Sequence, residues 1–276
     1  PQQIYSCKTY NAFGKNHCTQ HRIDYALAAV GSSTSLIYLL IAFSQGASVG
    51  AGVIVSQYLG AGDKKNVHKS IHTALAISVI LGFVLSVLGI IFSRKLLVMM
   101  NTPKEVLADA AKYLQIYSAG MIFNVVYNMA AGILNAAGNS KRSLLYLASA
   151  SVVNIFMDIL LIPVFHMGVE GAAIATDMSQ AVSCILAIGF LFKVKADYRV
   201  ELKEVKLYKS SAIRIIQVGL PTGIQNMVIS FSNILVQAGV NGFGAMAMAG
   251  FGAYMKIDGF NILPVLSFSM AMTTFV

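Results

Sequence analysis

Residues 152–163 of this chain read Val-Val-Asn-Ile-Phe-Met-Asp-Ile-Leu-Leu-Ile-Pro, an apolar stretch that holds one carboxylate, Asp158. The chain of 276 residues is 57% hydrophobic and only 11% charged, whereas about a quarter of the residues in a soluble domain are charged. A water-facing fold would not bury so much apolar surface, so the composition predicts a membrane protein. A charge near the middle of a membrane helix costs about 2.5–3.5 kcal/mol, and we therefore expect Asp158 to be functional.

Apolar stretches recur along the chain, and a membrane-spanning helix needs about 20 mainly apolar residues. We expect an all-α, multi-pass protein of the cell membrane (plasma or inner membrane). Within the first span, the small residues Gly46, Ala47, Gly50 and Ala51 should let a neighbouring helix approach closely. The expected transmembrane helices, about seven, lie at residues 33–59, 67–92, 106–136, 143–164, 172–192, 212–240 and 245–276.

The formal net charge is +9, and the basic residues gather in the loops between apolar stretches. Most of them precede the second and fourth spans or lie in the linker 193–211. An excess of Lys and Arg marks cytoplasmic loops, so we expect these loops on the cytoplasmic side. The basic residues are not interleaved with aromatic ones, which favours the lipid bilayer over a nucleic acid as the partner.

The linker 193–211 also divides the chain. An offset of 221 residues places Ala26-Leu-Ala-Ala-Val-Gly31 on Ala247-Met-Ala-Gly-Phe-Gly252, which indicates an internal repeat. We expect a polar segment outside the fold (1–24), a first bundle (25–192), the linker, and the beginning of a second bundle (212–276). In this register one helix is missing at the front and several at the back, so we expect the sequence to be a fragment.

Four motifs make this interpretation more specific. Residues 46–63 read Gly-Ala-Ser-Val-Gly-Ala-Gly-Val-Ile-Val-Ser-Gln-Tyr-Leu-Gly-Ala-Gly-Asp, and residues 131–140 read Ala-Gly-Ile-Leu-Asn-Ala-Ala-Gly-Asn-Ser. Residues 218–223 read Val-Gly-Leu-Pro-Thr-Gly, and residues 255–260 read Met-Lys-Ile-Asp-Gly-Phe. In order and spacing, the chain from residue 25 onward resembles the multidrug and toxic compound extrusion (MATE) family of bacteria and archaea.

The resemblance implies a twelve-helix fold in two lobes, of which this chain would supply helices two to eight. These are the N-lobe without its first helix, the linker between the lobes, and the start of the C-lobe. The resemblance also implies a secondary active antiporter, not an enzyme, which exports cationic amphipathic drugs and toxic compounds in exchange for Na+ or H+. It implies no cofactor besides this coupling ion, and we expect a monomer.

Three polar residues at membrane depth are the candidate Na+/H+ coupling site. Asn154 and Asp158 are four residues apart and share one helix face. Asp158 lies nine residues before the turn expected near Met167 and Thr176 lies nine after it, which places both at about the same depth, roughly 13 Å from the turn. Spacing alone does not choose Thr176 over Asp177. The resemblance does, because Asn154, Asp158 and Thr176 match the N-lobe cation site of prokaryotic members. Interhelical hydrogen bonding is the alternative role for Asn154 and Thr176.

Lys256, Asp258 and Tyr127 are weaker candidates for a substrate cavity. Lys256 and Asp258 are charged residues within a predicted span, but a separation of two residues turns them to different sides of a helix. Tyr127 offers an aromatic face for a flat cation. Ordinary helix packing is the alternative role for such an aromatic residue.

A flippase of lipid-linked oligosaccharides, which shares the two-lobe architecture, is the alternative function. It should carry a strongly cationic cavity, whereas the charges at membrane depth are mixed here. A seven-helix receptor is suggested only by the helix count, and no nucleophile or phosphate-loop motif of an enzyme occurs in the spans. Cys7, Cys18 and Cys184 make no disulfide framework, and with His17 and His21 they match no zinc spacing.

Overall fold

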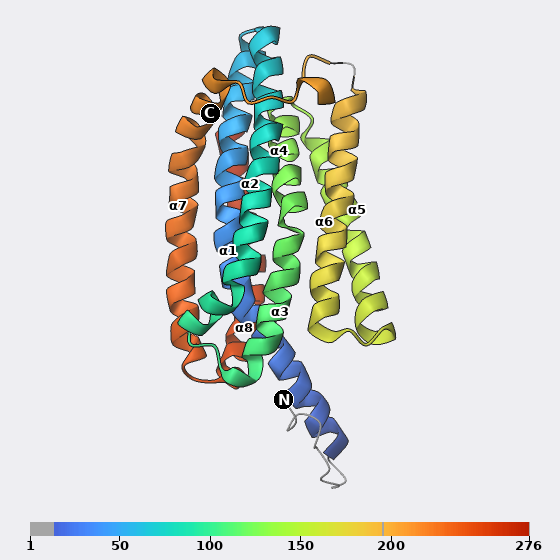
Figure 1. The fold of residues 1–276 in the computed structure, drawn as a ribbon, viewed down its shortest axis with the longest axis vertical. Coiled ribbons are helices and arrows are strands. Elements are labelled where there is room, and N and C mark those ends of the chain that lie inside the picture. The colour runs from blue at the N-terminus through green and yellow to red at the C-terminus, as the bar shows by residue number, and fades with distance from the viewer. Residues whose placement is uncertain (1–13, 195, 276) are drawn as a thin grey trace.

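The computed structural model describes residues 14–194 and 196–275, and within these ranges it consists of helices and connecting turns without a strand (Figure 1). The helices are α1 (Gly14–Gly60), α2 (Lys64–Met99), α3 (Lys104–Ala119), α4 (Met121–Ala136), α5 (Ser140–Ile159), the π-helical turn η2 (Leu160–Val164), α6 (Gly168–Lys193), the 3₁₀ turn η3 (Leu202–Glu204), α7 (Lys209–Asn241) and α8 (Ala245–Phe275).

The predicted all-α, multi-pass membrane fold is confirmed. In the described part of the chain, 4 helices are long and apolar enough to cross a membrane: α1 from Tyr25 onward, α2, α5 with its η2 extension, and α6. The bent pair of α3 and α4 is a fifth candidate when the two helices are counted as one broken span. Long helices also occupy the sixth and seventh predicted spans, but α7 and α8 fall outside this group. α7 is rich in amide and hydroxyl side chains, which lowers its hydropathy.

The third predicted span is bent. It breaks at Gly120 into α3 and α4, with a bend of 48°. A Cβ at Gly120 would overlap the carboxylate of Asp177, which α6 brings against this point of the chain. Only glycine leaves room for that carboxylate. Because glycine is also a weak helix former, the helix bends where α6 approaches it.

α1 runs through the middle of the bundle, and its most extensive contacts are with α7, which lies alongside it in Figure 1. A Cβ at Gly46 would lie 2.5 Å from Gly223 Cα, and one at Gly50 would lie 2.7 Å from Gly219 Cα. No side-chain carbon fits at these distances, so the two backbones touch. The prediction that Gly46 and Gly50 allow a close helix approach is confirmed.

A buried polar cluster fastens the C-terminal end of α7 to α1 and to the turn between α2 and α3. The Asn241 side-chain amide donates to the Met100 carbonyl oxygen at 2.9 Å and to the Ser32 hydroxyl at 3.2 Å. The Gln237 amide donates in turn to Asn241 Oδ1 at 2.9 Å. These buried groups satisfy one another, so the cluster fixes the end of α7 without leaving unpaired polar atoms.

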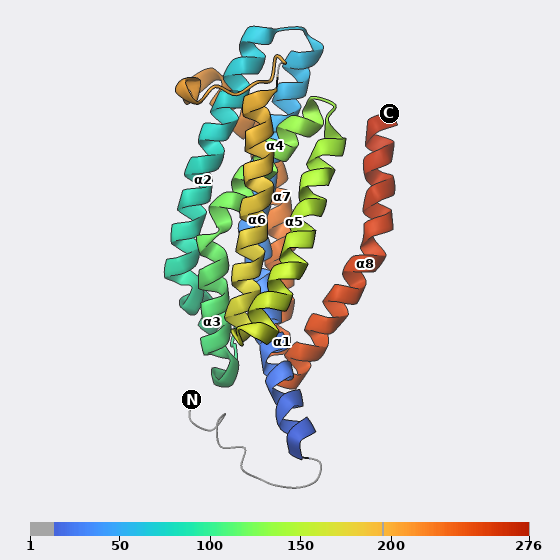
Figure 2. The same ribbon diagram turned by 90° about the vertical axis from the view of Figure 1, so that its right-hand side faces the viewer.

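α8 leaves the bundle. Figure 2 shows it close to α1 near its own N-terminal end and diverging from the other helices toward its C-terminus. At the contact, a Cβ at Gly31 would lie 3.6 Å from Gly252 Cα, and one at Gly252 would lie 3.8 Å from Gly31 Cα. These are the two glycines that the offset of the predicted repeat superposes. A reciprocal contact between equivalent residues is what a twofold relation between repeats produces.

Two hydrophobic clusters fill the bundle on either side of this polar and glycine-lined framework. One lies between α2, α4, α6 and the linker after α6, and includes Ile71, Ile133 and Leu191. The other joins α1, the end of α2 and α3, and includes Leu36 and Leu97. α5 contributes little to either cluster, since only 6% of its most apolar window is buried.

Candidate functional site

Asp158 lies on α5, the most exposed of the helices that are apolar enough to span a membrane. α5 packs against α6, and Asp158 is half-buried on it. The carboxylate atom Oδ1 is fully buried, and within the described part of the chain it has no hydrogen-bond partner. A buried carboxylate oxygen without a donor is costly unless a proton or a cation reaches it. Asp158 Oδ1 is thus a buried oxygen that a proton or a cation would satisfy.

Asn154 and Thr176 are half-buried, as is Asp158. Asn154 lies one turn before Asp158 on α5, and Thr176 lies on the neighbouring α6. The Thr176 hydroxyl donates to the Ala172 carbonyl oxygen at 2.9 Å, which fixes its hydrogen within α6. Its oxygen lone pairs remain available to a cation.

The turn between the two helices differs from the simple reversal that the sequence predicts. α5 continues through the π-helical η2, which contains Pro163, and the chain then reverses at His166 (φ 55°) and Gly168 (φ 58°). Proline removes a backbone donor, which favours the wider helical turn. Short π-helical segments are frequent at functional sites, and this one begins two residues after Asp158.

Asp177 lies in a different environment from Asp158. The sequence spacing alone did not choose between Asp177 and Thr176 as a ligand. The Asp177 carboxylate packs against Gly120 at the bend between α3 and α4. It also lines a shallow pocket of about 260 Å³ with Phe123 and Met178. Asp177 thus has a structural partner, whereas Asp158 Oδ1 has none.

Tyr113 of α3 lies near both carboxylates, since Asp158 and Asp177 each interact electrostatically with its hydroxyl. The sequence analysis did not single out this tyrosine. Its position four residues before Tyr117, on the face that α3 turns to α6, was the available signal.

The weaker candidates for a substrate cavity are dispersed. The Tyr127 side chain is 6% exposed, packs in the cluster between α2, α4 and α6, and donates from its hydroxyl to the Ser143 carbonyl oxygen at 3.0 Å. This position suits packing better than substrate contact. Asp258 is half-buried on α8, and the side chain of Lys256 lies outside the described part of the structure.

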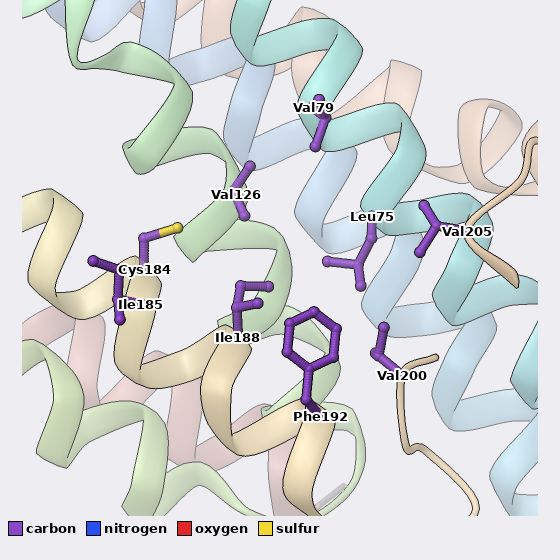
Figure 3. A pocket seen from close by; sticks show the side chains of 9 residues that line it. All are labelled: Leu75, Val79, Val126, Cys184, Ile185, Ile188, Phe192, Val200 and Val205. Carbon is purple, nitrogen blue, oxygen red and sulfur yellow. The ribbon is translucent and has the colours of Figure 1, made fainter. Parts of the chain in front are cut away.

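Two further features bear on a binding site. A pocket of about 270 Å³ between α2, α4, α6 and the linker is lined only by apolar residues and the thiol of Cys184, so it offers no cation ligand (Figure 3). Among the described residues, His68, His72 and Glu204 bring three potential metal-ligating atoms within 4.8 Å of one another. Of the zinc candidates that the sequence did not favour, Cys7 lies outside the described residues.

This geometry defines a class: a helical multi-pass membrane protein in which a carboxylate on one of two neighbouring spans, Asp158, has a buried oxygen without a hydrogen-bond partner among the described residues. Residues 19–160, just over half of the chain, match the model of the MatE family. The chain belongs to this family, the MATE transporters, as the four motifs predicted.

Relatives and solved structures extend the match to most of the chain. It is 30% identical over 249 residues to the probable multidrug resistance protein YpnP of Bacillus subtilis, an alignment that covers 90% of this chain and 56% of that protein. An inward-facing multidrug resistance MATE family transporter superposes with a TM-score of 0.82 and 26% identity, over 88% of this chain and 56% of the other. A transporter of the MOP superfamily from Pyrococcus furiosus superposes with a TM-score of 0.76 and 25% identity, over 90% and 57%. The chain thus spans about half the length of the relatives it matches.

Proposed function

We propose that this chain holds the coupling-ion site of a secondary active antiporter that exports cationic amphipathic compounds in exchange for Na+ or H+. Asp158 is the charged ligand, and Asn154 and Thr176 supply neutral oxygens. The relatives named as multidrug resistance proteins support the transported class. The observation that carries the proposal is the buried Oδ1 of Asp158, which lacks a partner in the described part of the chain.

The three side chains suit a small, hard cation. A carboxylate oxygen, an amide oxygen and a hydroxyl oxygen are the ligand types that such ions take. A proton on Asp158 would satisfy the same orphaned oxygen, so the same geometry serves either coupling ion. The cationic substrate competes with this ion because both neutralise the same carboxylate.

The division of the chain follows the same proposal. Residues 25–192 form most of the first lobe, residues 193–211 link the lobes on the cytoplasmic side, and residues 212–276 begin the second lobe. Transport then follows from the two lobes rocking about a central site. Asp258, on α8 of the second lobe, is a weaker candidate for contact with the substrate.

Ion binding to the chain itself tests the site. Na+ binding is measured by titration calorimetry on the purified chain in lipid nanodiscs, for the wild type, Asp158→Asn and Asp177→Asn. The last variant is the matched control, because it makes the same chemical change nineteen residues further along the hairpin. We expect saturable binding to the wild type and to Asp177→Asn, and none to Asp158→Asn.

A proton-coupled site gives a different signature in the same samples. The infrared band of a protonated carboxyl group should then be present in the wild type and in Asp177→Asn, and lost in Asp158→Asn. Loss of Na+ binding or of this band in Asp177→Asn alone would assign the site to Asp177. If the wild type shows neither Na+ binding nor the infrared band, the proposed coupling role of Asp158 is wrong.

A further inference from the structure

The segment between α6 and α7 lies along the first turns of α2 and is held there by polar contacts. We call residues 196–208 the linker segment. At its first end, the Tyr198 hydroxyl accepts a hydrogen bond from the Asn139 side-chain amide at 2.6 Å. At its last end, the Tyr208 backbone N–H donates to Thr73 Oγ1 at 3.2 Å. Val200, between them, is 2% exposed and packs into the hydrophobic cluster below.

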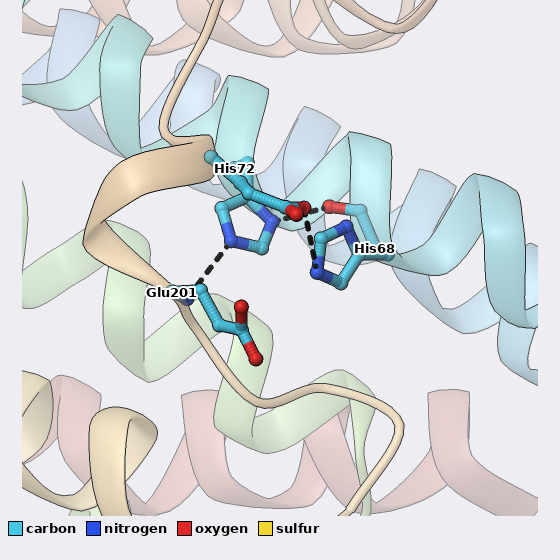
Figure 4. A network of polar contacts seen from close by, with 4 residues as sticks. His68, His72 and Glu201 are labelled. Atoms are coloured by element: carbon cyan, nitrogen blue, oxygen red, sulfur yellow. Dashed lines mark hydrogen bonds and ion pairs between the residues drawn. The ribbon is translucent and has the colours of Figure 1, made fainter.

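His72 makes the central contact, and its ring is 0% exposed (Figure 4). Its Nε2 accepts a hydrogen bond from the Glu201 backbone N–H at 2.9 Å, and its Nδ1 lies 2.7 Å from the His68 carbonyl oxygen. A backbone N–H only donates and a carbonyl only accepts. Nε2 must therefore be the bare nitrogen and Nδ1 the protonated one, so the contact requires a neutral ring in one tautomer.

The same geometry argues against metal binding by the cluster of His68, His72 and Glu204. Both nitrogens of His72 already have protein partners, whereas a metal ligand needs one free lone pair. The rings of His68 and His72 are in contact, with centroids 4.0 Å apart and planes tilted by 36°. The remaining ligand, Glu204, pairs with His68 Nε2 at 3.3 Å.

We propose that His72 is a pH-sensitive clasp: the neutral ring holds the linker segment on α2, and protonation of Nε2 releases it. A second ring proton, on Nε2, would point at the Glu201 backbone N–H, so two hydrogen-bond donors would face each other at a fully buried ring. The apolar pocket beneath, which Val200 and Val205 of the linker segment help to line, would be uncovered at the same time (Figure 3). This inference concerns the linker alone and does not depend on the proposed transport.

Charged and titratable side chains near His72 come from α2, the linker segment and α7. On α2 they are His68 and Lys69, and Lys69 Nζ lies 6.0 Å from the centre of the Tyr208 ring. On the linker segment they are the carboxylates of Glu201 and Glu204. On α7, Arg214 is engaged with the Tyr58 hydroxyl of α1 at 2.7 Å. Glu204 would attract a charged His72, but its carboxylate does not replace the lost acceptor for the Glu201 N–H.

Amide hydrogen exchange measures the clasp directly. The chain in lipid nanodiscs is compared at pH 8 and pH 5, on either side of the usual histidine pKa of about 6.5, with exchange times corrected for the intrinsic effect of pH. We expect protection of the Glu201 and Tyr208 amides at pH 8 and a loss of at least about tenfold at pH 5. The Met100 amide, which donates to the Leu96 carbonyl oxygen at 3.0 Å at the far end of α2, lies outside the linker segment and is the internal reference.

Three variants separate the roles of the histidines. His72→Gln places an amide oxygen near the position of Nε2 and does not titrate, so its amides should stay protected at both pH values. His72→Ala should lose protection at both, with helicity by circular dichroism as the check on folding. His68→Gln, the matched control, should behave as the wild type does.

The contrary outcomes are equally definite. Equal protection in the wild type at pH 5 and pH 8 would overturn the clasp. So would a loss at pH 5 that persists in His72→Gln, because the titrating group would then be a carboxylate. A pH response abolished by His68→Gln alone would transfer the switch to His68.

Discussion

α1 meets two helices through glycines, and the two contacts differ in how much space they leave. Against α7, an added Cβ at Gly46 would lie 2.5 Å from Gly223 Cα, and one at Gly50 would lie 2.7 Å from Gly219 Cα. Against α8, the corresponding distances at Gly31 and Gly252 are 3.6 and 3.8 Å, which is ordinary van der Waals contact. The first contact is a fixed joint and the second is a loose one. We therefore expect α7, although it follows the linker, to move together with α1, and we expect the angle between α8 and α1 to be able to change.

The largest effect is expected at the fixed joint. Gly50→Ala would place its Cβ against the Ile215 carbonyl and Gly219, which are backbone groups that cannot rotate away. Overpacking of this kind costs about 1–3 kcal/mol. We expect a clear fall in the thermal unfolding midpoint in detergent. Gly239→Ala on exposed α7 backbone, where nothing lies within 4 Å, is the matched control and should not lower the midpoint. Equal midpoints for wild type and Gly50→Ala would show that α1 and α7 are not in backbone contact.

A smaller effect is expected at the loose joint. Gly31→Ala and Gly252→Ala each add a methyl group at van der Waals distance, so their stabilities should lie within about 0.5 kcal/mol of the wild type. The distribution of distances between spin labels on α1 and α8 should also be as wide in both variants as in the wild type, because neither added methyl group locks the contact. A loss of stability as large as that of Gly50→Ala would remove the distinction between the two joints.

The smallest effect is expected just beyond the end of α1, at Asp63, the N-cap of α2. The Asn66 backbone N–H donates to Oδ1 at 3.1 Å and the Asn66 side-chain amide to Oδ2 at 2.6 Å. These bonds hold the pKa of the Asp63 carboxyl below its usual value. Its contribution to stability is therefore present above the ordinary aspartate pKa of about 3.9 and is lost as the pH falls through the lowered value.

Asp63→Asn isolates that contribution, because asparagine is an equally good cap that does not titrate. The unfolding midpoints of wild type and Asp63→Asn should be similar near neutral pH, and the wild type should fall below the variant in acid, as the carboxylate is protonated. A difference that does not change as the pH falls would mean that the bonds from Asn66 do not stabilise the carboxylate.

The sequence predicted the parts of this fold that depend on local composition. Most of the long apolar runs became helices close to the expected bounds, and small residues such as Gly46 marked a close contact. The exception is α1, which begins at Gly14, nineteen residues before the predicted start of the first span. The break at Gly120 was not predicted, because one glycine in an apolar run is a weak signal until the carboxylate of Asp177, more than fifty residues away, is placed against it. The contact of His72 with Glu201 was missed for the same reason, since no local pattern joins a helix to a distant linker.

The candidate site was predicted in part. The spacing of Asn154 and Asp158, and the return of the chain to Thr176, follow from helix geometry. The π-helical turn η2 and the proximity of Tyr113 do not, because both depend on how α3, α5 and α6 pack together. The choice between Thr176 and Asp177 needed the family resemblance, and the partner of Asp177 at Gly120 is the structural difference between the two carboxylates.

Ethidium efflux from vesicles under an imposed Na+ or H+ gradient tests the central claim, that Asp158 couples ion flow to export. The assay is made on this sequence in its complete genetic context, because the chain alone spans about half the length of its relatives. The account predicts gradient-driven efflux that is abolished by Asp158→Asn and retained by Asp177→Asn, and the effective gradient names the ion. Efflux that survives Asp158→Asn would contradict the account, and the absence of efflux under either gradient would favour the flippase.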